Sequence, residues 1–225
     1  MNYKTAMKFS FQKWTILVVL FAALSNPLKS RSADSSGTHI IHLWNGMDTD
    51  GWQVFNTNGL PIEKFCTVSN GILALHGKPN GFLRTTRKYS NYNLHVVWRW
   101  SQDVPKNNSG IFIHVTGEDK IWPESIQCQV KVGQTGELLG MSPAKFDAPL
   151  VQGKMLVPCA KPNEKPVGQW NDYDIHCEGS RVQTTLNGLP EAGVGGCSVT
   201  NGFIGLQSEG YGIEFRVIDL FSKAG

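Results

Sequence analysis

The residues of this chain with the clearest chemical potential lie on two neighbouring alternating runs, 109–115 and 125–132. Side chains point to opposite faces in turn along a β-strand, so Gln127 and Gln129 share one face and the apolar residues between them take the other. The same alternation in the first run predicts that His114 joins the glutamines. Two strands would then present a polar face, which is a candidate floor for a hydrogen-bonding ligand, most naturally a sugar.

A cation could complete this face. In the run 92–101, Arg99 shares a side with His95, opposite the tryptophans that we expect in the core. Whether Arg99 reaches the polar face depends on strand register, which the sequence does not fix. The alternative is an arginine at a sheet edge, beside glutamines that only solvate an open face. For His114 the alternative is a plain hydrogen-bonded neighbour.

Short alternating runs predict strands along most of the chain, and helix signals are nearly absent. Turn pairs separate many of the runs, at Asn70-Gly71, Asn80-Gly81, Asn187-Gly188 and Asn201-Gly202. Many short strands with tight turns predict an all-β fold, an antiparallel sandwich or barrel. The predicted strands are 39–44, 64–68, 71–76, 81–86, 92–101, 109–115, 125–132, 170–178, 181–187, 201–207 and 213–220.

The segment from Met141 to Gly168 is rich in Pro, Lys and Gly, which predicts a long irregular loop. Loops of this length are uncommon in compact domains unless they are functional. We therefore expect this segment to form one wall of the ligand cleft.

The N-terminal segment has the pattern of a secretory signal peptide. Lys4, Lys8 and Lys13 precede the apolar run 14–24. This run of about eleven residues is shorter than the roughly twenty that span a bilayer as a helix, so no stable membrane insertion is expected. The predicted organisation is a signal peptide over 1–25, a disordered leader over 26–39 and a single domain over 40–225, in a secreted or periplasmic protein.

The formal net charge is +3, from 21 basic and 18 acidic residues. Loss of residues 1–25 removes three lysines and no acid, which leaves 18 of each. A near-neutral chain lacks the clustered basic surface that a phosphate backbone requires, so no nucleic-acid partner is expected.

Metal and redox chemistry have little support in the sequence. The five cysteines form no C-x-x-C pair, and we predict that Cys66, Cys128 and Cys177 are small buried strand residues, with one bridge elsewhere left open. No histidine motif for a metal occurs, so no cofactor is expected. Asp48 and Asp50 could supply oxygens to a structural calcium, although a solvated turn is the simpler interpretation.

Seven motifs together resemble the 3-keto-disaccharide hydrolase domain family. They are LWNGMDTDGW (43–52), VSNGILALHG (68–77), NNSGIFIHV (107–115), IWPESIQCQV (121–130), GQWNDYDIHCEG (168–179), LNG (186–188) and GFIGLQSEGYGIEFR (202–216). The resemblance covers about residues 40 to 221, with the motifs in family order and spacing. It implies a concanavalin-like jelly-roll sandwich, an exported location, and cleavage of glycosides whose sugar has first been oxidised at C3 by a partner oxidoreductase.

The implied chemistry makes definite demands on the site. A ketone at C3 acidifies the C2 hydrogen, so a base can remove it, the C1 leaving group departs with acid help, and water then adds back. This route needs a base near C2, a proton donor at the glycosidic oxygen and donors for the enolate, for which Arg99 and His114 are candidates. It does not need the opposed carboxylates of an ordinary glycosidase.

The sequence departs from the family pattern at Gln127, where many members carry glutamate. An amide cannot act as a Brønsted base near neutral pH. Glu124 lies at an odd offset and so on the opposite face, unless the stretch before it is loop rather than strand. Glu209, in the retained LQSEG motif, is the better surviving carboxylate. The expected catalytic residues are therefore Glu209, Glu124 and His114.

The expected substrate-binding residues are Arg99, Asn108, Trp122, Gln127, Gln129 and Gln207. Trp122 could stack on a pyranose ring or serve as a local packing anchor, whereas the other tryptophans of the motifs are expected to be structural. Two further classes of function stay open beside the enzyme: a non-catalytic carbohydrate-binding module on the same fold, and a structural exported protein.

Overall fold

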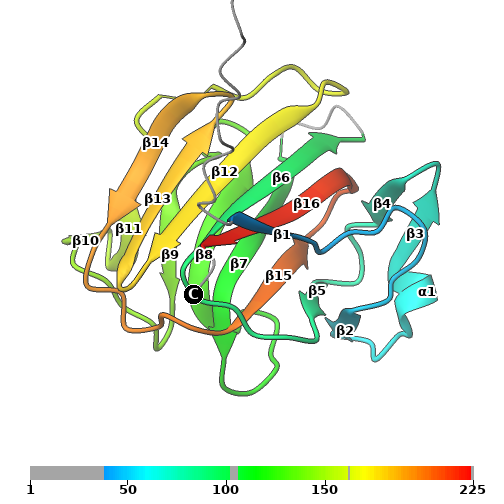
Figure 1. Ribbon diagram of the computed structural model, residues 1–225, viewed down its shortest axis with the longest axis horizontal. Coiled ribbons are helices and arrows are strands. Elements are labelled where there is room, and N and C mark those ends of the chain that lie inside the picture. The colour runs from blue at the N-terminus through cyan, green and yellow to red at the C-terminus, as the bar shows by residue number, and fades with distance from the viewer. Residues whose placement is uncertain (1–37, 102–105, 162, 224–225) are drawn as a thin grey trace, which may run out of the picture. The chain divides into compact units, whose positions relative to one another are not determined.

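The computed structural model describes residues 38–101, 106–161 and 163–223 (Figure 1). The predicted signal peptide and nearly all of the predicted leader lie outside these residues. Within them, two antiparallel sheets of eight strands each form a sandwich. We name them the β6 sheet and the β7 sheet after their central strands. The predicted all-β antiparallel sandwich is confirmed.

The β6 sheet has the order β14-β13-β12-β6-β16-β4-β3, with β1 paired to β16. Its strands are β14 (Leu189–Val194), β13 (Arg181–Leu186), β12 (Asn171–Glu178), β6 (Tyr92–Trp100), β16 (Ile213–Lys223), β4 (Ile72–Leu75), β3 (Cys66–Ser69) and β1 (Thr38–His42).

The β7 sheet has the order β10-β11-β9-β8-β7-β15-β5-β2. Its strands are β10 (Leu150–Val151), β11 (Lys154–Val157), β9 (Leu138–Met141), β8 (Glu124–Lys131), β7 (Asn108–Thr116), β15 (Phe203–Ser208), β5 (Gly81–Thr85) and β2 (Trp52–Asn56). A single four-residue helix, α1 (Ile62–Phe65), joins β2 to β3 in the described chain.

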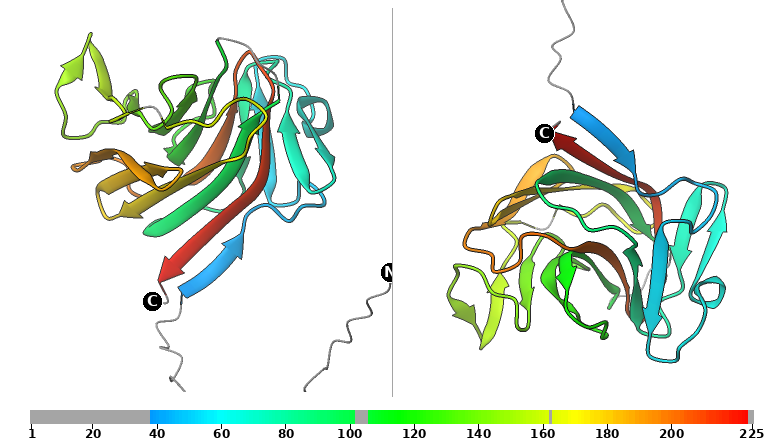
Figure 2. Two further views of the ribbon diagram at one scale, coloured as in Figure 1. Left: turned by 90° about the horizontal axis from the view of Figure 1, so that it is seen from above. Right: turned by 60° about the horizontal axis from the view of Figure 1, so that its bottom comes forward.

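The two sheets lie one over the other. In Figure 1 strands β12, β6 and β16 cross in front of β8, β7 and β15. Figure 2 shows the layers from two further sides, with the β10–β11 hairpin at one edge of the sandwich and β2 to β4 at the other. Each sheet therefore has one face in the core and one face turned away from it.

The core forms where the alternation predicted it. Leu94, Val96, Trp98 and Trp100 of β6 are each at most 1% exposed and belong to one cluster with inward-facing residues of the other sheet, among them Cys128. Burying each large apolar side chain stabilises the fold by about 1.5–3 kcal/mol. Because these residues occupy alternate positions, the residues between them face away from the core.

Two of the four predicted Asn-Gly turns close hairpins. Asn70-Gly71 joins β3 to β4, and Asn187-Gly188 joins β13 to β14; both residues of each pair have positive φ, as two-residue type I′ turns require. The other two pairs are not hairpin turns. Gly81 is the first residue of β5, and Gly202 forms an isolated bridge with Tyr89.

The prediction of an irregular loop over 141–168 was wrong in part. The segment contains the hairpin of β10 and β11, and β11 pairs with β9. β2, β9 and β14 were also missed. All of these strands have six residues or fewer, which is too short to establish a clear alternation.

No helix of the described chain is long and apolar enough to cross a membrane.

Candidate functional site

Three glutamines and one glutamate form a continuous hydrogen-bonded chain on the β7 sheet. Gln127 Nε2 donates to Gln129 Oε1 over 2.8 Å and to Gln207 Oε1 over 3.1 Å. Gln207 Nε2 in turn donates to Glu209 Oε2 over 2.7 Å. We call Gln127, Gln129, Gln207 and Glu209 the glutamine row. The first two lie on β8, whereas Gln207 lies on β15, two strands away.

A glycine on the strand between them makes this contact possible. Gly110 of β7 lies opposite Gln129, and a Cβ atom at Gly110 would stand only 2.5 Å from Gln127 Nε2. Since no side chain occupies that position, Gln127 lies across β7 and reaches Gln207. The row is thus built by amide side chains from two strands and by the missing side chain of a third.

The row faces away from the core, yet its amides are largely buried. Gln127, Gln129 and Gln207 are 4%, 7% and 2% exposed, whereas Ile126 and Cys128 between the β8 glutamines belong to the core. Buried amides avoid a desolvation penalty when they pair with one another. The hydrogen bonds run toward Glu209, which is half-buried. Gln207 therefore fixes the orientation of the one carboxylate in the row.

Asn108 stands beside Glu209. The two residues form an isolated antiparallel bridge, which continues the pairing of β7 beyond the end of β15. Asn108 Oδ1 is buried and has no hydrogen-bond partner among the described residues. An acceptor of this kind, next to a carboxylate, suits a hydroxyl donor of a ligand.

His114 does not join this face, and the prediction that it does was wrong. The pairing of β7 with β8 shifts between Ile113 and Thr116, which marks a β-bulge. His114 has φ +55° within this bulge. An extra residue reverses the alternation, so Val115 instead of His114 packs with Phe112 on the outer face.

The His114 ring is buried on the core side. It contacts the Tyr92 ring edge-to-face at a centroid distance of 5.6 Å, and its Nδ1 is 3.2 Å from the Val199 carbonyl oxygen. Burial lowers its pKa from 6.5 to about 4, so the imidazole is neutral at pH 7. The structure therefore separates His114 from the glutamine row and from the catalytic role expected for it.

Arg99 lies on the other sheet. Its Nε donates to Glu214 Oε2 over 2.6 Å, and its guanidinium stacks on the Trp170 ring at 4.4 Å. Arg216 covers the same indole at 4.6 Å. The register that the sequence left open thus places Arg99 on the outer face of the β6 sheet, away from the glutamine row.

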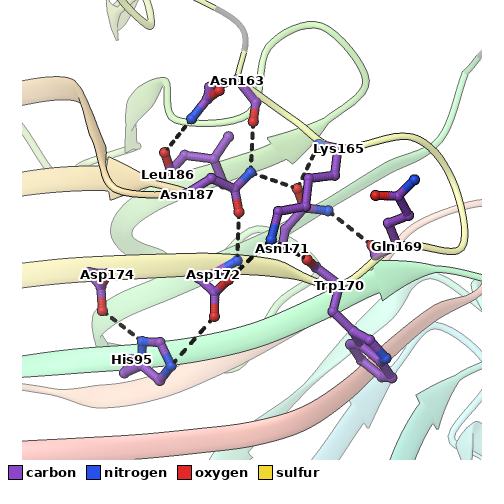
Figure 3. Close-up of polar contacts among 10 residues, drawn as sticks. All are labelled: His95, Asn163, Lys165, Gln169, Trp170, Asn171, Asp172, Asp174, Leu186 and Asn187. Carbon is purple, nitrogen blue, oxygen red and sulfur yellow. Dashed lines mark hydrogen bonds and ion pairs between the residues drawn. The ribbon is translucent and has the colours of Figure 1, made fainter. Parts of the chain in front are cut away.

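The loop before β12 is fixed to the end of the β6 sheet at which β12 begins. Figure 3 shows Asn187, of the Asn-Gly turn, donating to the Asn163 carbonyl and to Asn171 Oδ1, while Lys165 Nζ donates to the Trp170 carbonyl. This end of the segment over 141–168 is held against the β6 sheet. Its first part encloses, with β9 to β11, a separate cavity of about 750 Å³ lined by residues such as Leu139 and Met155.

Glu124 and Trp122 lie at the other end of β8. Glu124 is its first residue and pairs with Thr116, so the stretch is strand at this point, and the odd offset from Gln127 holds. The structure thus favours Glu209 over Glu124 as the carboxylate beside the glutamines. Trp122 precedes β8 and is 48% exposed. An indole so exposed is free to contact a ligand.

An aromatic floor adjoins the glutamine row, and sequence reasoning missed it. Phe82 and Phe112 are fully buried and pack together with Phe55 and Phe203. Phe82 lies directly opposite Gln207. The alternation in 81–86 is a signal for Phe82, but its place beside Gln207 depends on the pairing of β5 with β15, which only the fold reveals.

A cation lies beyond the aromatic floor, and it too was missed. Arg84 stacks on the Phe203 ring at 4.2 Å, and its Nη2 is 3.2 Å from Asp119 Oδ2 and 3.3 Å from Gln53 Oε1. The outer face of the β7 sheet therefore runs from polar amides through aromatic rings to an ion pair.

Among the described residues the cysteines form no disulfide and no metal-binding group. All five are free thiols, so the bridge left open by the sequence does not form. Cys66, Cys128 and Cys177 are buried in strands as predicted, and burial raises the pKa of the Cys177 thiol to about 12. Among the described residues no group of three His, Cys, Asp or Glu could hold a metal ion.

The aspartates considered for calcium serve a turn. Asp48 Oδ1 accepts hydrogen bonds from Asn45 Nδ2 over 2.7 Å and from the Asp50 amide over 3.0 Å. The Asn45 hydrogen bond lowers the pKa of Asp48.

Comparison with protein families confirms the resemblance that the motifs carry. Residues 39–220 match the 3-keto-alpha-glucoside-1,2-lyase-like domain. No curated protein matches the chain.

Solved structures share the fold. A candidate glycosyl hydrolase from Parabacteroides distasonis is 20% identical, with a TM-score of 0.61 over 82% of this chain and 99% of that one. Bacillus licheniformis β-glucanase is 13% identical, with a TM-score of 0.57 over 84% and 100%. The carbohydrate-binding module CBM66 from Bacillus subtilis is 10% identical, with a TM-score of 0.50 over 77% and 92%. These likenesses establish the concanavalin-like sandwich.

Proposed function

Because the chain belongs to the 3-keto-alpha-glucoside-1,2-lyase-like domain family, we propose that it cleaves 3-keto-glucosides by elimination followed by hydration. The observation that supports this most directly is the glutamine row, a set of buried amides that ends on a single oriented carboxylate. The row lies on a face of a fold shared with a β-glucanase. Family membership supports a carbohydrate-active role, and the reaction on 3-keto-glucosides is what we propose.

In this proposal Glu209 is the general base. Its Oε2 accepts the Gln207 hydrogen bond, which leaves Oε1 to take the proton from C2 of the 3-keto sugar. The electron pair of the C2–H bond moves to the C3 oxygen as an enolate. The enolate then collapses: the C3 ketone re-forms, the C2–C3 electron pair makes the C1–C2 double bond as the C1–O bond breaks, and the leaving group takes a proton.

Hydration completes the reaction. Water adds its oxygen to C1 and its hydrogen to C2, which saturates the C1–C2 double bond and yields a free 3-keto sugar. The proton that Glu209 removes can pass to the departing oxygen, so one carboxylate serves both proton transfers. This matters because no second carboxylate belongs to the glutamine row.

The neighbouring amides would hold the substrate and its enolate. Both Nε2 hydrogens of Gln127 are used within the row, which leaves its Oε1 for a sugar hydroxyl. Gln129 Oε1 accepts within the row, so its Nε2 is the donor suited to the C3 oxygen. Asn108 Oδ1, buried beside Glu209, would accept from a sugar hydroxyl.

Export and an oxidising partner are parts of the proposal. The three lysines and the apolar run at the N-terminus support a secreted or periplasmic location. A 3-keto substrate requires prior oxidation of a glucoside at C3, so the proposal implies a sugar 3-oxidoreductase that acts before this protein.

A second candidate is a non-catalytic saccharide-binding module. Gln127 favours it, since an amide occupies a position where many relatives carry a potential base. The fold is compatible with it as well, as the likeness to CBM66 illustrates.

One experiment separates the two candidates. The purified protein is incubated with a 3-keto-glucoside and aglycone release is followed, while calorimetry measures binding of the unmodified glucoside. Turnover supports the enzyme. Saturable binding of the unmodified glucoside at the glutamine row without any aglycone release would support the module and contradict the enzyme.

A further inference from the structure

A pocket of about 380 Å³ lies at one end of the β6 sheet, where β6 begins and β12 and β16 end. Its walls include Asn93, His176, Glu178 and Phe221. None of these residues belongs to the glutamine row, which lies on the other sheet. Pockets for small ligands commonly enclose about 300–1,000 Å³, so this one is the size for a single sugar unit or a chain end.

Three of the lining residues form a row across three strands. Asn93 lies directly opposite His176 on β12 and directly opposite Phe221 on β16. Their strand neighbours Leu94, Ile175 and Leu220 are core residues. The row of Asn93, His176 and Phe221 therefore points away from the core, and the phenyl ring stands beside two hydrogen-bonding side chains.

The polar groups of the pocket are already oriented. His176 Nδ1 is hydrogen-bonded to Asn93 Oδ1, and His176 Nε2 is 3.8 Å from Glu178 Oε2. Asn91 Oδ1 accepts from the Gly179 amide over 2.8 Å, which ties the β12–β13 turn to the start of β6. Side chains held on strands in this way lose little freedom when a ligand binds.

The composition of the pocket selects a ligand class. An aromatic ring can pack against the apolar face of a pyranose, while an amide, an imidazole and a carboxylate exchange hydrogen bonds with hydroxyl groups. The negative charge of Glu178 disfavours phosphate, sulfate and uronate groups. We propose that this pocket is a second saccharide-binding site, which takes a neutral pyranose unit.

Binding at the second site does not depend on the reaction proposed at Glu209. Tyr92 and Cys177 also line the pocket, and both belong to the core that separates the β6 sheet from the β7 sheet. A glycan could occupy this pocket while another saccharide occupies the glutamine row. The site would raise the local concentration of substrate without contacting the reacting atoms.

The test is an NMR titration of the full chain with methyl glucoside, an unmodified neutral sugar. We expect saturable shifts of the amide signals of Asn93, His176 and Phe221. Phe221→Ala removes the stacking surface and should weaken this binding about tenfold. If Phe221→Ala disturbs the fold, Asn93→Ala serves as a second variant at an exposed position. It should weaken the same binding.

The matched control is Leu189→Ala. Leu189 is an exposed apolar side chain on the same sheet, beside the Asn187-Gly188 turn near the other end of β12, and its loss should leave the titration unchanged. Glu209→Gln should also leave these shifts unchanged, so a failure of the proposed reaction is distinguishable from a failure of this proposal. The second site would be overturned by an absence of shifts at the Asn93 row, or by equal affinity in the Phe221 variant.

Discussion

The Gln127 side chain lies across Gly110, and an added Cβ at Gly110 would stand 2.5 Å from Gln127 Nε2. This relationship joins β8 to β15 over the intervening strand, because Gln127 spans the gap that the glycine leaves and donates to Gln207. The order of the glutamine row thus depends on a residue that contributes no functional group.

Gly110→Ala should therefore disrupt the row. The methyl group would displace the Gln127 amide and leave buried groups without partners, at a cost of about 1–3 kcal/mol in the free energy of unfolding. Denaturant unfolding measures the stability, and aglycone release measures the activity. Gly193→Ala on β14, where a Cβ has ordinary contacts from 3.4 Å, is the control and should change neither. A Gly110 variant as stable and as active as the native protein would contradict this account of the row.

A second prediction concerns Gln127 itself. If the chain cleaves 3-keto-glucosides, Gln127→Glu should raise turnover, because it places a titratable base where relatives carry one, and general bases contribute roughly 100-fold to 10,000-fold. Gln129 can turn its amide to donate to the new carboxylate. Rates on one 3-keto substrate are compared side by side with those of Gln129→Glu, which adds the same charge on the same strand face. An unchanged or lower rate would mean that a carboxylate at position 127 does not act as a base in this site.

Local alternation predicted the β8 face correctly because it is a property of a regular strand. Gln127 and Gln129 share the outer face, and Ile126 and Cys128 lie in the core. The partners of that face could not be predicted in the same way. Gln127 and Gln207 are 80 residues apart, and their meeting depends on the pairing of β7 with both of its neighbours.

Two failures have a common physical origin in strand pairing. The alternation correctly placed Arg99 on the face of β6 opposite the tryptophans. Which sheet contains β6, however, depends on long-range strand pairing. The prediction for His114 failed because one bulge reverses the alternation after Ile113, and no glycine or proline among residues 113–116 signals this bulge. Short edge strands such as β10 were missed because two residues carry no period.

The buried His114 predicts a pH dependence of stability. Its folded pKa of about 4 lies below the ordinary value of 6.5, so the unfolded chain binds the proton more readily. Stability is then full above about pH 6.5 and falls as the pH drops toward 4, by about 3 kcal/mol at most for a shift of this size. Unfolding free energies of the native protein and of His114→Gln are measured at several pH values in this range.

The variant should show a shallower decline, because the group that titrates on unfolding is gone. His39→Gln provides the control, since His39 is exposed on β1 and should leave the slope unchanged. Parallel pH profiles for the native protein and His114→Gln would show that other groups govern the acid limb.

Glu209 is the carboxylate on which the proposed chemistry depends. Glu209→Gln keeps the size of the side chain and an acceptor for Gln207 Nε2, while it removes the base. We expect kcat on a 3-keto-glucoside to fall about 100-fold or more, with the affinity for the unmodified glucoside retained. Glu209→Asp keeps the base on a shorter stem and should retain part of the activity, which separates loss of the carboxylate from loss of its position. Equal losses of binding and turnover in Glu209→Gln would instead indicate that Glu209 holds the sugar, and no change in either would remove it from the site.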